Sequence, residues 1–267
     1  MNLSHTDIGS PSDSPLLFIH GLGASSQQIT SVLTMLHNTF LIAPDMPGHG
    51  GSLDFDPELF SFDYFADLVI ALLDELGIEQ TDLGGISMGS GIALNIALRY
   101  PERVKKLIVL RPSWLDQKEP PHLSLVARVG QWLDAHDEEK ATMELALHPD
   151  YQNLVEQNLI VAESITGLLD RRKDDASTRV LFKMWQSRPF ESLQSLATIP
   201  NETLVLDTTR DELHPQAIAT AIAEPLPNSS TATLPPRYYE SKAYQSALND
   251  TLNRFLGRIR EDSVCHS

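Results

Sequence analysis

The sequence feature that most constrains the fold is a short apolar run leading directly into Gly85-Ile86-Ser87-Met88-Gly89, followed by a segment rich in alanine and leucine. This order predicts a strand, a sharp turn and a helix, with Ser87 at the turn. Glycines two residues before and after the serine let strand and helix pass without a Cβ clash. The turn exposes the serine hydroxyl beside the positive end of the new helix. This spacing alone also fits a glycine-rich turn whose serine has no catalytic role. The rest of the sequence is needed to distinguish the two interpretations.

Length and charge narrow the possible classes of protein. The chain has 267 residues, of which 42% are apolar, and this suits one α/β domain with an inserted segment. A formal net charge of −16 repels phosphate backbones and anionic lipids, so nucleic acid and membrane surfaces are poor partners. The single cysteine, Cys265, excludes an internal disulfide and a cysteine-rich metal site.

The expected partner is a small-molecule substrate or ligand, and nothing in the sequence specifies an oligomeric state. The first residues lack the basic and apolar regions of a signal peptide, and no apolar run approaches about 18 residues. The expected location is therefore the cytoplasm.

Strands alternate with amphipathic helices along the first part of the chain. Residues 1–14 are polar and predict a flexible lead-in, so the opening edge of the sheet should be shortened. Apolar runs typical of strands follow at 15–20, 40–45, before Ser87 and at 104–110. One helix is predicted from the glycine turn after His20 to about His37. A second helix, capped by Asp63, is predicted over 64–76. This alternation predicts a parallel sheet covered on both faces, whose binding crevice lies at the carboxyl ends of the strands.

The pattern changes between residues 113 and 190, where no strand alternation occurs. We expect the core to comprise residues 1–112 and 191–267, and residues 113–190 to form a helical cap over the crevice; a structural layer without functional role is the alternative. Strands resume at 202–207 and 230–234, with helices over 216–224 and 244–259. The helices predicted in the insertion are Leu123–Ala135, Glu138–Leu147, Leu154–Leu169 and Asp175–Gln186.

Over roughly residues 15–257 the chain resembles the α/β-hydrolase family. The resemblance rests on segments 17–23, 43–50 and 85–89, on the insertion after 104–110, and on Arg210-Asp211 after a late strand. It implies an α/β-hydrolase fold, meaning a mostly parallel, doubly wound sheet with a helical cap, and a serine hydrolase without a cofactor. It further implies that Ser87 is the nucleophile, that the backbone N–H groups of Leu22 and Met88 form the oxyanion hole, and that Asp211 orients the base.

The family's catalytic histidine normally follows the last strand, but the stretch 234–242 contains none. A serine hydroxyl without a base is a poor nucleophile at neutral pH. His214 follows Asp211 by three residues, and two roles are open for it: general base, or cap of the next helix with a hydrogen bond to Asp211. Other candidates for the vacated place are Tyr238, Tyr239 and Lys242, while His266 lies in the terminal tail.

The remaining polar candidates have weaker signals. His20 and His49 occupy loops in which the family carries structural histidines, and His122, His136 and His148 lie in the predicted cap, where one could lean over Ser87. We include His20, Arg111 and Arg210 as candidate substrate contacts; the two arginines could bind a carboxylate or phosphate, or pair with neighbouring acids. The histidines lack metal-ligand spacing, and Ser26 interrupts any dinucleotide fingerprint after His20.

Three functions are compatible with these observations. The first is a hydrolase of a small ester, thioester or amide that uses Ser87, Asp211 and His214. The second is a catalytically degenerate relative that keeps the pocket to bind a ligand or partner. The third is a non-hydrolytic enzyme that uses the oxyanion hole without forming an acyl-enzyme.

Overall fold

The computed structural model describes residues 2–171 and 174–258. Its centre is a seven-stranded sheet with the order β1-β3-β2-β4-β5-β6-β7. The pairs from β3 through β2, β4, β5 and β6 to β7 are parallel, and β1 is antiparallel to β3. The strands are β1 His5–Ile8, β2 Ser14–Ile19, β3 Thr39–Pro44, β4 Thr81–Ile86, β5 Val104–Leu110, β6 Glu202–Thr208 and β7 Ser229–Leu234.

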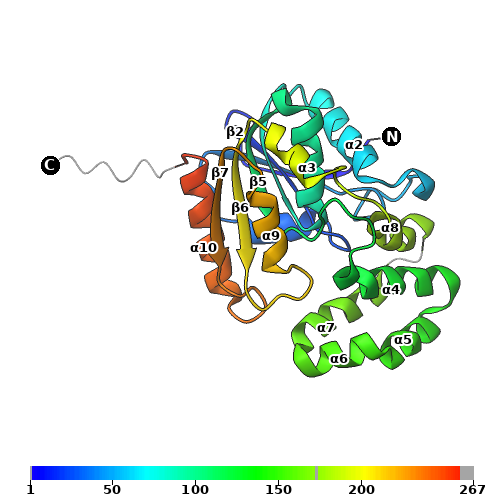
Figure 1. The fold of residues 1–267 in the computed structure, drawn as a ribbon. Coiled ribbons are helices and arrows are strands. Elements are labelled where there is room, and N and C mark those ends of the chain that lie inside the picture. Colours follow the sequence, from blue (N-terminus) through cyan, green and yellow to red (C-terminus); the bar gives the residue numbers. More distant parts are fainter. Residues whose placement is uncertain (1, 172–173, 259–267) are drawn as a thin grey trace.

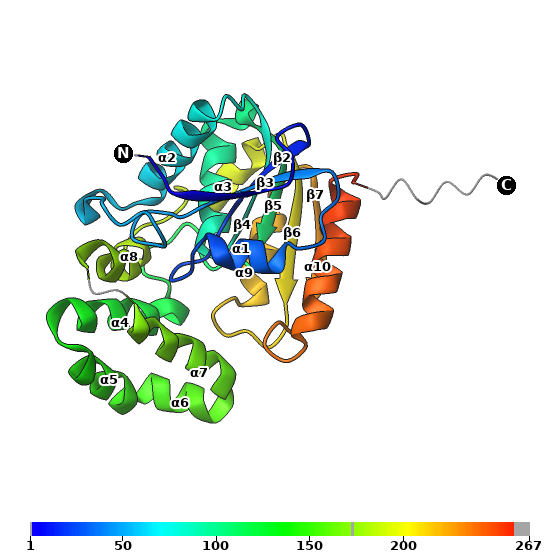
Figure 2. The ribbon, with the colours of Figure 1, turned by 180° about the vertical axis from the view of Figure 1, so that it is seen from behind.

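Helices cover both faces of this sheet (Figures 1 and 2). Because successive strand residues point to opposite faces, Leu17 and Ile19 join one apolar core while Leu16 and Phe18 join the other. The first core includes residues of α2 Phe62–Glu75, α3 Met88–Arg99 and α9 Gln216–Ala223; the second includes residues of α1 Ser26–Val32 and α10 Ser241–Phe255. The continuous apolar runs in the sequence are thus strands buried from two sides.

Between β5 and β6, the described residues form five α-helices. Figures 1 and 2 show α4 to α7 outside the sheet-and-helix layers, with α8 between them and α2. These elements occupy the region for which the sequence predicts helices without strands. They are α4 Ser124–Ala135, α5 Glu138–Leu147, α6 Pro149–Gln157, α7 Leu159–Thr166 and α8 Asp175–Trp185.

Asn158 breaks the helix predicted over Leu154–Leu169 into α6 and α7. Its backbone leaves the helical region at φ −154° and ψ 81°, and its side chain accepts a hydrogen bond from the Val161 N–H to cap α7. The same side chain donates to the Arg210 carbonyl and to Glu212, and accepts from the Tyr239 hydroxyl. Asn158 therefore joins the helical segment to the loops after β6 and β7.

Three local predictions at the start of the chain are corrected by the structure. Residues 5–8 are not a flexible lead-in, because they pair with β3 as a short edge strand. The first helix ends at Val32 rather than near His37, since side chains of α10 accept hydrogen bonds from the Met35 and His37 amides. The cap of α2 is Ser61, whose hydroxyl accepts from the Tyr64 amide, and not Asp63.

The C-terminal helix α10 begins three residues before the predicted start and ends at Phe255. Ile259, Cys265 and His266 lie outside the described residues. In the part of the chain that the structure describes, no helix is both long enough and apolar enough to cross a membrane.

Candidate active site

Ser87 lies at the turn between β4 and α3, with φ 56° and ψ −114°. Non-glycine residues rarely adopt positive φ, so neighbouring structure must hold this conformation. A Cβ on Gly85 would lie 2.1 Å from the Gly89 backbone, and one on Gly89 would lie 2.2 Å from the Ile19 carbonyl oxygen. The two glycines permit strand, turn and helix to pack this closely, which is the geometry that the sequence predicts.

The hydroxyl of Ser87 has a defined partner. Its Oγ lies 3.2 Å from Oγ of Ser113, and Ser113 Oγ donates to the Leu213 carbonyl at 2.8 Å. Because the single proton of Ser113 is used in that bond, Ser87 is the donor to Ser113. Within the described ranges, no hydrogen bond joins Ser87 to a histidine. Ser113 therefore connects Ser87 to the loop that carries His214.

Asp211, Arg111 and His214 form one buried cluster at the carboxyl ends of β5 and β6. Arg111 Nε and Nη2 donate to Oδ2 of Asp211 at 3.1 and 2.7 Å, and His214 Nδ1 lies 2.9 Å from Oδ1. Burial opposes ionisation of Asp211, but His214 and Arg111 outweigh it and hold the pKa of this carboxyl below its usual range. Asp211 is therefore ionised at neutral pH.

The protonation of His214 follows from its two neighbours. Burial, reinforced by the positive charge of Arg111, lowers the pKa of His214 to about 4, so the ring is neutral at pH 7. Nδ1 lies 2.9 Å from both Asp211 Oδ1 and Arg111 Nη2, and it cannot donate to one and accept from the other at once. Within the described residues, His214 is the only donor to Oδ1, so a proton on Nδ1 satisfies this buried oxygen.

This tautomer leaves Nε2 of His214 with a free lone pair. The alternative role of His214 as the cap of α9 is only partly met: it bonds to Asp211, but the N-cap of α9 is Pro215, without a side-chain cap bond. The hydrogen bond to Asp211 is common to both sequence hypotheses for His214, and the free lone pair on Nε2 is compatible with the position of a base.

Two neutral histidines fix the loop after β2. His20 donates from Nδ1 to the Gly21 carbonyl and accepts the Met46 amide at Nε2, while His49 accepts the Gly23 amide at Nε2. Burial lowers the pKa of His20 to about 4 and holds that of His49 well below its usual value. His20 is fully buried, both of its ring nitrogens are engaged, and it does not line the cavity described below.

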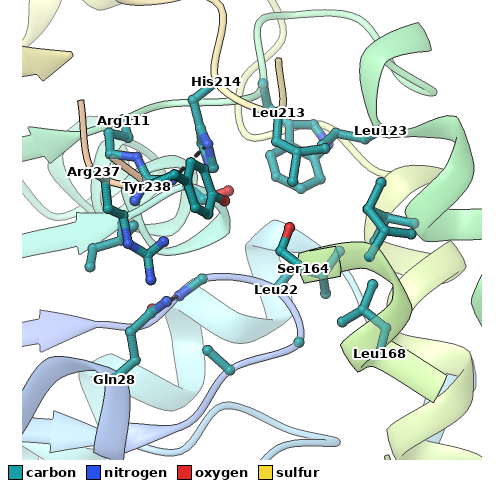
Figure 3. Close-up of a pocket in the computed structure, with 18 residues that line it drawn as sticks. Leu22, Gln28, Arg111, Leu123, Ser164, Leu168, Leu213, His214, Arg237 and Tyr238 are labelled. Carbon is teal, nitrogen blue, oxygen red and sulfur yellow. Dashed lines mark hydrogen bonds between the residues drawn. The ribbon is translucent and has the colours of Figure 1, made fainter. Parts of the chain in front are cut away.

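A cavity of about 210 Å³ opens over Ser87 (Figure 3). Its polar wall includes Ser87, His214, Gln28 and Arg237. Much of its apolar wall comes from α4, α7 and the turns beside them. The larger apolar side chains are Leu22, Ile86, Trp114, Leu123, Val126, Ile165, Leu168 and Leu213.

The loop that carries Leu22 also lines this cavity. The amides of Leu22 and Met88 donate to no acceptor within the described residues, whereas the Gly21 and Gly23 amides on either side of Leu22 are engaged. These two N–H groups are therefore available to a ligand oxygen.

The two candidate arginines have different positions. Arg111 lines the cavity, but its guanidinium is engaged by Asp211, in agreement with the alternative of pairing with an acid. Arg210 is exposed, stacks on the Tyr239 ring at 3.6 Å and does not line the cavity. The sequence analysis missed Ser113 and Arg237; the signal for both is their position just past the carboxyl ends of β5 and β7.

None of the three histidines of the helical segment lines the cavity over Ser87. His122 Nε2 lies 3.0 Å from the Ser113 carbonyl, and His148 accepts the Asp150 amide as the cap of α6. Of the candidates for the vacated histidine position, Tyr238 lines the cavity, whereas Tyr239 and Lys242 do not. Across residues 2–171 and 174–258, no group of three or more histidine, cysteine, aspartate or glutamate side chains is arranged to hold a metal ion.

Comparison with known proteins agrees with this architecture. Residues 14–152 match the sequence profile of a family described as "alpha/beta hydrolase fold". A 2-hydroxymuconate semialdehyde hydrolase of Pseudomonas putida is 28% identical over 238 residues, covering 80% of this chain and 76% of the relative. A second protein of that name, from Pseudomonas sp. strain CF600, is 39% identical over 100 residues, 36% of this chain and 35% of the relative.

Among solved structures, a meta-cleavage product hydrolase from Pseudomonas fluorescens IP01, complexed with acetates, superposes with a TM-score of 0.72. It is 20% identical in sequence, and the superposition covers 96% of this chain and 94% of that one. At this level of sequence identity, the likeness shows a shared fold and nothing further. Relatives that align over most of the chain carry hydrolase names, which supports hydrolase activity in general. The match to the family profile, together with the sheet order and the Ser87 turn, shows that this chain belongs to the α/β-hydrolase fold family.

Proposed function

We propose that this protein hydrolyses a small ester, thioester or amide with Ser87 as the nucleophile. The observation that carries the proposal is that Ser87 and His214 line one cavity, while Nδ1 of His214 contacts the buried carboxylate of Asp211. An imidazole oriented by a carboxylate and facing a serine is the arrangement that activates a hydroxyl for acyl transfer.

In the proposed reaction, Ser87 Oγ bonds to the substrate carbonyl carbon, and its proton passes to Nε2 of His214. The amides of Leu22 and Met88 donate to the oxyanion, which stabilises the negative charge formed there. When the bond to the leaving group breaks, His214 returns the proton to that group. A water molecule then gives a proton to His214 and attacks the carbonyl carbon of the acyl-enzyme. The bond between this carbon and Ser87 Oγ breaks, His214 returns the proton to Ser87, and the acid is released.

Residues 113–190 act in this proposal as a cap on a core made of residues 1–112 and 191–267. Support comes from the apolar wall of the cavity, much of which α4 and α7 supply. Apolar walls exclude water and strengthen the electrostatic interactions of the reacting groups. We propose that the helical segment sets the size and shape of the acyl group that the site accepts.

A specific observation also favours the second candidate function, ligand binding without hydrolysis. The hydroxyl of Ser87 donates to Ser113 rather than to His214, and a histidine with a pKa of about 4 is a weak base at pH 7. Hydrolysis therefore requires the Ser87 hydroxyl to rotate from Ser113 toward His214 when substrate binds. On this account we expect slow turnover in comparison with enzymes whose base has a pKa near 7.

The two functions are separated by the hydrolysis of p-nitrophenyl butyrate. We expect Ser87→Ala and His214→Gln each to lower kcat/KM by about 1,000-fold or more, because each removes a member of a unit that acts together. His136→Gln, a histidine of the helical segment outside the cavity, is the matched control and should retain the native rate. Equal rates for the native protein and Ser87→Ala would reject hydrolysis by Ser87 and favour ligand binding.

A further inference from the structure

Arg237 is the second arginine in the wall of the cavity and lies just past the end of β7. The charge of the first, Arg111, is balanced by Asp211 at 2.7 Å. In contrast, the Arg237 side chain forms no ion pair or hydrogen bond with any residue that the structure describes. Its nearest defined partner is the Tyr238 ring, with Cζ 5.4 Å from the ring centroid.

The electrostatic balance of the cavity leaves one positive charge unmatched. None of the described residues that line it is an aspartate or glutamate, His214 is neutral at pH 7, and Arg111 is paired with Asp211 behind the wall. Burial, together with the charge of Arg111, lowers the pKa of Arg237, which reflects the cost of placing this cation here. Arg237 is half-buried, and a cation that is partly removed from water is stabilised by an anionic partner.

The neighbouring cavity does not supply that partner. Arg237 also borders a second cavity that contains Asp170, but no ion pair joins the two side chains. The protein as a whole carries a net charge of −16, so acidic groups are abundant elsewhere on the chain. A guanidinium without an ion-pair partner, in the wall of the cavity that Ser87 also lines, is thus a local exception to the overall negative charge.

Figure 3 shows that polar and apolar side chains lie on opposite sides of the cavity. The Arg237 guanidinium points into the cavity on the same side as Gln28, whereas Leu123, Leu168 and Leu213 lie on the opposite side. Gln28 Oε1 accepts the Gly21 amide at 2.9 Å, so the amide nitrogen of Gln28 remains a donor. One end of the cavity therefore offers a guanidinium and an amide donor, and the other end offers an apolar surface.

We propose that Arg237 binds a carboxylate of the substrate, so that the site accepts short acids whose ester, thioester or amide bond lies over Ser87. This inference deepens the proposed function, on which it rests, by naming the substrate class. A planar carboxylate matches the fork of a guanidinium, which binds it through two parallel hydrogen bonds. The volume of about 210 Å³ restricts the remainder of the ligand to a short apolar chain.

Binding can be tested without catalysis in the Ser87→Ala variant. The probes are butyrate and butyramide, which have nearly the same shape but differ in charge, titrated at pH 7 and followed by NMR chemical shifts. We expect butyrate to bind about tenfold more tightly than butyramide, because only butyrate forms charge-assisted hydrogen bonds with Arg237. The shifted resonances should include those of Gln28 and Tyr238.

Variants of Arg237 identify the source of this preference. In the Ser87→Ala background, Arg237→Gln should abolish the preference for butyrate, and Arg237→Lys should restore part of it by retaining the charge. Arg128→Gln, which removes an exposed arginine of α4, is the control for the same change in net charge and should keep the preference. Circular dichroism of each variant verifies the fold.

The outcomes for this inference and for the proposed function are separable. A preference for butyrate that depends on Arg237 supports the inference even if p-nitrophenyl butyrate is not hydrolysed. Equal affinity for the two probes, absence of binding by both, or a preference that survives Arg237→Gln overturns it. Hydrolysis that depends on Ser87 would remain valid in each of these cases.

Discussion

In the proposed mechanism the Ser87 hydroxyl exchanges one hydrogen-bond acceptor, Ser113, for another, His214. In the structure it donates to Ser113, while the ring of His214 is held by Asp211 at the edge of the same cavity. Rotation about one side-chain bond redirects a hydroxyl without moving the backbone. The resting hydrogen bond to Ser113 is therefore compatible with a nucleophilic role when substrate is present.

The low pKa of His214 predicts an unusual dependence of Ser87 reactivity on pH. A base with a pKa of about 4 stays neutral down to pH 5.5, whereas a histidine at its ordinary pKa would be about nine-tenths protonated there. We expect the rate of modification of Ser87 by a fluorophosphonate to stay nearly constant between pH 5.5 and 7.5. Rates from intact-mass spectra provide the measurement; a tenfold fall over this interval would contradict the assigned environment of His214.

Residue types and their order were enough to predict the roles proposed for Ser87 and Asp211, but not the full environment of either. Arg111 and Asp211 are distant in sequence, and no local periodicity indicates that their side chains meet. Ser113 has a positional signal, just past the carboxyl end of β5, but its contacts are not predictable because its partners Ser87 and Leu213 belong to two other loops. The position of Arg237 in the cavity wall was not predicted either. The stretch 234–242 is distinguished in the sequence by the absence of the histidine that the family normally carries there.

At the scale of elements, the turn between β4 and α3 depends on glycine at position 89. A Cβ there would approach the carbonyl oxygen and carbon of Ile19 and the carbonyl oxygen of His20, all of them backbone atoms that cannot rotate away. The helix α3 would have to move from the sheet to relieve this contact.

We predict that Gly89→Ala destabilises the protein by about 3 kcal/mol, the upper part of the range for overpacked sites. Urea unfolding followed by circular dichroism measures the change. Gly167→Ala is the matched control, because a Cβ there meets no atom within 4 Å and should change stability little. Equal unfolding midpoints for the two variants would refute the proposed close contact.

Most elements were predictable because their signals are local: apolar runs for strands buried on both faces, and helical spacing for amphipathic helices. The errors occurred where distant groups intervene. Side chains of α10 bind the amides after α1, and Asn158 bonds to the loops after β6 and β7 where the sequence suggests a continuous helix. The edge strand β1 is fixed by pairing with β3, which its own polar sequence does not indicate.

At the scale of the whole molecule, buried histidines make the fold sensitive to acid. His20 and His214 have folded-state pKa values of about 4, and that of His49 is also well below its ordinary value of 6.5. Between pH 6.5 and 4 the unfolded chain binds protons at these positions and the folded chain does not. Stability therefore falls as the pH decreases through this window.

We predict a loss on the order of 3 kcal/mol for each of His20 and His214 between pH 6.5 and 4, because every tenfold loss of proton affinity on folding corresponds to about 1.4 kcal/mol. The free energy of unfolding, measured in urea at intervals across this range, tests the prediction. His20→Gln should make the dependence on pH shallower. A stability that stays constant from pH 6.5 to 4 would show that these side chains titrate normally in the folded protein.

The most direct test of a serine nucleophile supported by His214 is intact-mass labelling with a fluorophosphonate. We predict that the native protein gains one adduct, that Ser87→Ala gains none, and that His214→Ala reacts much more slowly than the native protein. His136→Ala should react at the native rate. Absence of an adduct on the native protein, or unchanged labelling of Ser87→Ala or His214→Ala, would contradict the proposed roles of these two residues.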